Sequence, residues 1–152
     1  MRRVLLLALP ALALSGCKHQ PTLVGSWTWE NDIEVRDRNM PTRGQETFLE
    51  DGMFRSIARI EGAGGRVLVS SHQGTWKLDG NLLTEKVLDI HWDVEGNTRG
   101  SEAIRAALQS KKKTLLEDLN KHPTVEITWV TDDLVKYVLD SKTYRLFRKK
   151  DR

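Results

Sequence analysis

From Leu23 onward, short runs in which apolar and polar residues alternate are separated by turn residues, and this pattern is typical of β-strands. Asp51-Gly52 between two apolar runs is a strong hairpin signal, and Asp79-Gly80-Asn81 closes a later run. The predicted strands cover residues 23–30, 47–49, 53–60, 66–78, 82–94, 124–130, 134–139 and 143–148, the fourth being either one long strand or two short ones. About eight strands joined mostly by tight turns predict a mainly β fold, an antiparallel up-and-down barrel.

One segment, residues 101–121, has helical periodicity instead. Ile104, Leu108 and Leu115 recur at helical spacing, Ser101 is available as N-cap, and Pro123 follows the far end. We therefore expect one amphipathic helix inserted between strands. Its other face carries the three lysines of residues 111–113, which indicates either a solvated face or contact with anionic lipid headgroups.

The amino terminus is typical of an export signal. Arg2 and Arg3 precede an apolar stretch, residues 4–14, that is too short to span a bilayer. The following Leu14-Ser15-Gly16-Cys17 resembles the lipobox of bacterial lipoproteins. The resemblance implies diacylglycerol on the Cys17 sulfur, cleavage before Cys17 and acylation of the freed amine, which together give stable anchoring. The alternative is a free cysteine after an ordinary signal peptide.

These signals divide the chain into a lipoprotein signal peptide (1–16), a lipidated tether (17–22) and a barrel domain (23–152). Lys18 stands where an inner-membrane retention signal would place Asp, so the resemblance to sorted lipoproteins favours the outer membrane, with the domain facing the periplasm. Residues 18–21 span roughly 13 Å when fully extended. The domain is therefore expected close to the lipid surface, with the membrane as a partner through Cys17.

Charge and cysteine content exclude several classes of function. The chain has a formal net charge of +3, which falls to +1 when residues 1–16 and their two arginines are removed. Such a balance disfavours nucleic acid as a partner. The single cysteine excludes an internal disulfide framework and a zinc site built on paired thiolates.

Several motifs resemble the small lipocalin-like domains of bacterial lipoproteins, which are of the calycin type. The similarity begins with Gly25-Ser26-Trp27 and continues through residues 48–54, 74–84, 127–134 and 143–148. It implies that Trp27 plugs the closed end of the barrel and that Arg145 or Arg148 stacks on its ring. It also implies binding of a small hydrophobic or amphipathic molecule.

The other tryptophans are candidates for the wall of such a binding site. Trp76, Trp92 and Trp129 would line a ligand cavity if one is present, although tryptophans in such strands more often pack in a core. Trp29 shares strand parity with Trp27 and is expected on the same side.

A metal site and catalysis have little support. Asp89, His91, Asp93 and Glu95 share one face of a predicted strand, but this is the spacing of any solvent-facing edge, so we expect no metal and no cofactor. No serine occupies a nucleophile-elbow setting, and we expect no enzyme.

The leading hypothesis is therefore a lipid-anchored, non-catalytic envelope protein that binds a small ligand. One alternative is a protein-binding module, such as an envelope inhibitor of a lytic enzyme, with specificity on exposed loops at 31–43 or 61–65. Another is a structural lipoprotein of envelope assembly.

Overall fold

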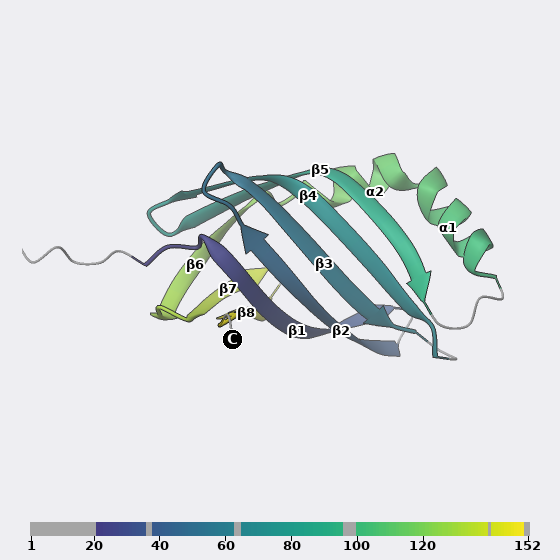
Figure 1. Ribbon diagram of the computed structural model, residues 1–152, viewed down its shortest axis with the longest axis horizontal. Helices are drawn as coiled ribbons and strands as arrows, with labels where there is room; N and C mark the ends of the chain where they lie inside the picture. Colours follow the sequence, from purple (N-terminus) through teal and green to yellow (C-terminus); the bar gives the residue numbers. More distant parts are fainter. Residues whose placement is uncertain (1–20, 36–37, 63–64, 96–99, 140, 151–152) are drawn as a thin grey trace, which may run out of the picture.

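The computed structural model describes residues 21–35, 38–62, 65–95, 100–139 and 141–150, with the backbone alone at 32–35 and 38–39. Eight antiparallel strands follow one another around a closed barrel, β1 to β8, and β8 pairs with β1 (Figure 1). The strands are β1 (Gly25–Val35), β2 (Arg38–Phe48), β3 (Met53–Glu61), β4 (Val67–Asp79), β5 (Leu82–Glu95), β6 (Thr124–Thr131), β7 (Leu134–Leu139) and β8 (Lys142–Arg148). The predicted fold class is confirmed.

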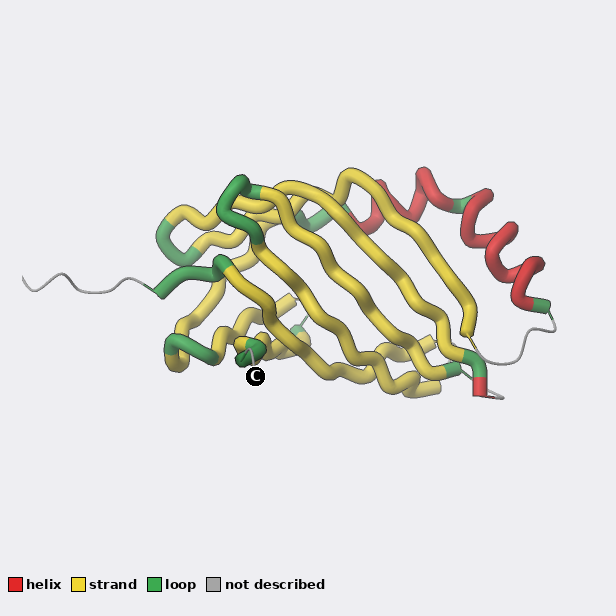
Figure 2. The backbone as a smooth tube through the Cα atoms, in the orientation of Figure 1, coloured by secondary structure: helices red, strands yellow, loops and turns green. Residues whose placement is uncertain are grey.

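The barrel closes unevenly along its length. The first five strands are long and form one strongly curved sheet, whereas β6, β7 and β8 are short (Figure 2). The two closing seams are brief, because β5 pairs with β6 only from Leu82 to Thr84 and β1 pairs with β8 only at Trp27 and Thr28. The barrel is therefore tight at one end and widens toward the other.

Past Thr84, the free edge of β5 is covered by the segment between β5 and β6. The Asn120 side chain donates to the Val87 carbonyl (3.0 Å) and accepts from the Val87 N–H (2.9 Å), as a neighbouring strand would. The Glu85 N–H donates to the Pro123 carbonyl (2.7 Å). These bonds satisfy backbone groups that an open strand edge would leave unpaired.

The predicted single helix is two helices, α1 (Ser101–Ser110) and α2 (Lys112–Leu119), which lie beside β5 (Figure 1). The division falls at Lys111, whose N–H donates to the Leu108 carbonyl three residues back, a tighter turn that ends α1. Ion pairs from Arg105 to Asp93 (2.6 Å) and from Lys112 to Asp89 (2.5 Å) attach both helices to the outer face of β5. Neither described helix is long and apolar enough to cross a membrane.

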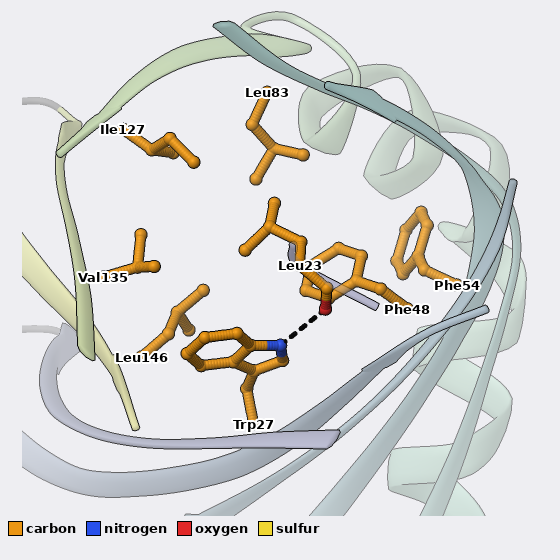
Figure 3. Packing of buried hydrophobic residues seen from close by; sticks show 8 residues of the cluster. All are labelled: Leu23, Trp27, Phe48, Phe54, Leu83, Ile127, Val135 and Leu146. Atoms are coloured by element: carbon orange, nitrogen blue, oxygen red, sulfur yellow. Dashed lines mark hydrogen bonds between the residues drawn. The ribbon is translucent and has the colours of Figure 1, made fainter. Parts of the chain in front are cut away.

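The core fills the tight end of the barrel. Eight buried side chains point toward one another there, one from each strand except β4 and one from Leu23 ahead of β1, as Figure 3 shows. They are Leu23, Trp27, Phe48, Phe54, Leu83, Ile127, Val135 and Leu146. Side chains therefore close this end of the barrel.

Trp27 is the centre of this plug, as the sequence predicts. Its ring is fully buried, and its Nε1–H donates to the Leu23 carbonyl (2.7 Å; Figure 3). Of the two arginines considered, Arg148 stacks on the ring, with its Cζ 4.3 Å from the ring centroid. Gly25 has a φ of +123°, and a Cβ there would lie 2.9 Å from the Arg148 guanidinium. A glycine at position 25 thus permits the positive φ and leaves space for the Arg148 guanidinium to stack on Trp27.

The structure corrects the interpretation of residues 31–43 as an exposed loop. Residues 31–35 extend β1 and residues 38–43 begin β2, and they pair in continuous register from Asn31 with Thr42 to Val35 with Arg38. Polar and apolar residues alternate over 32–35, whereas residues 38–43 are mostly polar. The continuous backbone pairing makes strands of both segments.

Candidate ligand-binding cavity

A cavity of about 250 Å³ lies directly beyond the plug, on the side away from the amino-terminal residues 22–24. On β1, β2, β3, β5, β6 and β7 a cavity residue lies two positions from a plug residue, as Trp29 does after Trp27 on β1 and Glu46 before Phe48 on β2. The lining residues are Trp29, Glu46, Phe54, Ser56, Ala58, His72, Leu83, Glu85, Val87, Leu119, His122, Pro123, Val125, Tyr137 and Leu139.

Two carboxyl groups, Glu46 and Glu85, face this cavity from β2 and β5. Removal from water raises the pKa of Glu46 to about 7, and a weak hydrogen bond from the Ser56 hydroxyl (3.4 Å) offsets part of that rise. Burial raises the pKa of Glu85 well above its usual value, and the negative charge of Glu46 raises it further. The pair therefore favours its protonated form in the unliganded barrel.

Two further titratable groups of the cavity, His72 and Tyr137, are neutral near pH 7. Burial lowers the pKa of His72, whose Nε2 lies 2.8 Å from the Ser70 hydroxyl. Burial and the nearby glutamates raise the pKa of the Tyr137 phenol, whose ring stacks on that of Tyr144 at a centroid distance of 5.0 Å. No lysine or arginine is among the described residues that line the cavity.

Trp29 forms one wall of the cavity. Its indole lies flat against the backbone of Gly44, where a Cβ would come within 2.3 Å of the ring. Its Nε1–H is buried and has no hydrogen-bond acceptor in the described part of the chain. A buried donor without an acceptor costs roughly 1 to 3 kcal/mol. The Trp29 N–H is thus an unsatisfied donor packed against β2, with almost no surface open to the cavity.

A second hollow, about 710 Å³, lies on the outer surface where β1 and β8 separate. It combines the half-exposed apolar side chains Ile57 (49% exposed) and Phe147 (47%) with three arginines. Two of these arginines are already paired, Arg43 with Glu61 (3.6 Å) and Arg59 with Glu95. We call this hollow the outer groove.

The three tryptophans proposed from the sequence lie apart from the cavity lining. Trp76 donates to the Leu49 carbonyl (3.0 Å) and packs edge-on against Phe48. Trp129 makes an edge contact with Trp27 at a centroid distance of 6.2 Å. Trp92 is 8% exposed and lies opposite Ser70. Among the described lining residues, the tryptophan present is Trp29.

The acidic face of β5 is engaged by cations of the protein itself. Asp89 pairs with Lys112, Asp93 with Arg105, and Glu95 with Arg59, so each carboxylate has a basic partner. Within the described ranges, no group of three or more His, Cys, Asp or Glu side chains gathers as metal ligands do. Cys17, the predicted lipidation site, lies outside the described residues.

Sequence reasoning missed Glu46 and Glu85, although a signal was present. Each shares strand parity with a core residue two positions away, Phe48 and Leu83 respectively. A carboxylate in the buried register of a strand is rare, and it marks a polar interior.

The closed eight-stranded antiparallel barrel is compatible with a lipocalin-like fold. Neither a protein-family model nor a curated protein matches the chain. The function is therefore inferred from the barrel and its cavity.

Proposed function

We propose that this protein is a lipid-anchored, non-catalytic envelope protein whose barrel binds a small amphipathic molecule. The observation that supports ligand binding most is the cavity itself, which joins apolar walls to a few polar groups in the manner of small-molecule sites. Leu83, Val87 and Val125 supply apolar surface, whereas Glu46, Glu85 and Ser56 supply polar atoms. The ligand would occupy the space beyond the plug, between the strands and the end of α2.

The cavity volume limits the size of that ligand. Sites for drug-sized molecules measure about 300 to 1,000 Å³, and the cavity is smaller, at about 250 Å³. A molecule with one ring or a short chain matches this space better than a fatty acid or a phospholipid.

Anchoring rests on the lipobox resemblance of residues 14–17 and on the position of the chain that follows. The Arg148 guanidinium donates to the carbonyls of Thr22 (2.5 Å) and Val24 (2.9 Å), which fixes this segment beside the plugged end. A lipid on Cys17 would therefore hold the plugged end of the barrel at the membrane surface. The membrane in this proposal is the outer membrane, and the domain faces the periplasm.

The anchor is tested by replacing Cys17 with serine. Because the thioether must form before the lipoprotein peptidase cleaves, the Cys17→Ser chain should be exported but remain unprocessed and unlabelled by a radioactive fatty acid. Equal labelling of the variant and the wild type would contradict the anchor. A Ser15→Ala chain, which keeps a small residue before the cleavage site, is the matched control and should be labelled normally.

Ligand binding is tested by fluorescence excited at 295 nm, with 2-phenylethanol as the neutral probe. Because Trp29 lines the cavity, the probe should change its emission in a saturable way. A Trp29→Phe chain should lose most of this response, whereas Trp76→Phe should retain it, since Trp76 lies outside the cavity lining. Absence of any saturable response to small probes of any charge in folded protein would overturn the binding function.

The outer groove favours a second candidate function, a protein-binding module. Exposed Ile57 and Phe147 beside Arg43, Arg59 and Arg145 resemble the mixed apolar and arginine composition of protein interfaces. If the folded protein binds none of the small probes, this result would favour protein binding at the outer groove.

A further inference from the structure

The cavity contains two acidic groups and no lysine or arginine among its described lining residues. Glu46 and Glu85 both line it, and the negative charge of Glu46 acts on Glu85. Two histidines, His72 and His122, also line it, and burial lowers the pKa of His72 so that its ring is neutral near pH 7.

The polar atoms of the cavity also lack partners. In the described part of the chain, the Glu85 carboxylate makes no hydrogen bond or ion pair, and Glu46 has only the long contact with Ser56. The two half-buried carboxyl groups therefore face the cavity with few partners in the protein, and a bound molecule that carries donor groups would satisfy them.

Resting on the proposed function, we propose that the ligand is a small organic cation, an alkylammonium with a compact apolar body, held by Glu46 and Glu85. An ammonium group supplies the donors that two carboxylates need. Trp29, Phe54 and Tyr137 surround the same space, and aromatic faces attract such a cation. Carbons of the ligand would contact Leu83, Val87 and Val125.

A metal ion fits this site less well than an amine does. Calcium takes six to eight oxygen ligands, and magnesium takes six. The cavity offers two carboxylates within a largely apolar wall, and no triad of metal-ligating side chains occurs among the described residues. An organic cation instead uses both the charge and the apolar surface.

Binding would depend on pH because the two carboxyl groups must ionise to hold a cation. The titratable groups that face the site are Glu46 on β2, His72 on β4, Glu85 on β5, His122 after α2 and Tyr137 on β7. The ligand stays protonated throughout, since an alkylammonium has a pKa of about 10. With the pKa of Glu46 at about 7, protonation of this group alone should lower affinity about tenfold between pH 8 and pH 6, and protonation of Glu85 should lower it further.

The test uses the full-length protein in phosphatidylcholine nanodiscs, with empty nanodiscs as blank. Calorimetric titrations compare three probes of one size and different charge: 2-phenylethylamine, 2-phenylethanol and phenylacetate. We expect the amine to bind at least tenfold more tightly than the alcohol at pH 8 and phenylacetate not to bind.

Two variants identify the carboxylates that act. Glu46→Gln and Glu85→Gln should each weaken amine binding at least tenfold and leave alcohol binding within twofold. Glu126→Gln removes the same charge from an exposed position beside Val125 and should change neither. Circular dichroism spectra of all variants establish that the barrel is intact, and a variant that fails to fold is replaced by Glu→Asp at the same position, which keeps the charge and should keep binding.

The outcomes separate this inference from the proposed function. Equal affinity for the alcohol and the amine would overturn the proposal that the ligand is a cation, and so would unchanged amine binding in both Gln variants. Either result would still agree with a barrel that binds a small ligand. Displacement of the amine by micromolar calcium would overturn the proposed organic cation in favour of a metal site. Binding of none of the probes would overturn the proposed function itself.

Discussion

Replacing Trp27 with alanine should lower the free energy of unfolding by about 3 to 5 kcal/mol. The ring is fully buried at the centre of the plug, so its removal leaves a cavity among Phe48, Leu146 and their neighbours. The substitution also removes the stacking surface under Arg148 and the hydrogen bond to Leu23. Because domains are commonly stable by only 5 to 15 kcal/mol, the loss is a large share of the total.

Chemical denaturation at pH 7 measures this loss. Phe147→Ala is the matched control, since it removes an exposed aromatic ring one residue from Arg148, and it should change the unfolding free energy by less than about 1 kcal/mol. An unchanged midpoint for Trp27→Ala would show that this ring does not support the barrel end.

Glu46→Gln should stabilise the unliganded protein at pH 8 by up to about 3 kcal/mol and have little effect at pH 4. The pKa of Glu46 is about 7 in the folded protein against 4.5 as the ordinary value, so the folded state binds the extra proton between these limits. Stability from this group is therefore fully present below pH 4.5 and is lost as the pH rises through 7. Glutamine keeps a neutral side chain at every pH and avoids the loss.

Urea titrations of both proteins at pH 4, 6 and 8 test this expectation. His72 acts in the opposite direction, because its lowered pKa makes stability increase as the pH rises toward 6.5, but it is common to both proteins and largely cancels in their difference. Exposed Glu126→Gln should show no such pH dependence. A stability difference independent of pH would contradict the burial of a titrating carboxyl at this position.

The barrel could be predicted because its strands bury one face. Alternation around Phe54, Leu83 and Leu146 marks strands whose inner side chains form the core, and the turn residues Asp51 and Gly52 separate two of them as expected. Trp27 could be assigned to the plug because Gly25-Ser26-Trp27 resembles the calycin motif, and the structure adds that Gly25 leaves space for the Arg148 guanidinium.

Other features depend on interactions that a linear pattern does not contain. The hairpin of residues 31–43 is held by backbone pairing, which is independent of side-chain type. The division of the helix at Lys111 follows from a three-residue hydrogen bond, which the apolar spacing of 101–121 does not reveal. Asn120 acts as a substitute strand partner for β5 only because the fold brings it beside Val87.

The candidate site shows the same division. Glu46 and Glu85 occupy inward positions that strand parity predicts, yet their proximity arises from closure of β2 and β5 around a common space. The sequence offered Trp76, Trp92 and Trp129 as possible wall residues beside the more common core packing, and Trp76 and Trp129 pack against the core. Whether a tryptophan lines the cavity depends on its position along the barrel axis. Trp29 occupies the next inward-facing position on β1 after Trp27, and this position lies at the cavity.

The plugged end has a consequence for how an anchored molecule would exchange its ligand. Arg148 holds Thr22 and Val24 against the plugged end of the barrel. A short lipidated tether would therefore orient the barrel with this end toward the membrane and the opposite end away from it. The cavity would then be reached from the aqueous side, and the bilayer could not deliver a molecule through the packed floor. Such a protein would bind ligand that is dissolved in the periplasm near the membrane. Removing the lipid anchor would change where the ligand is bound but not the affinity of the barrel for it.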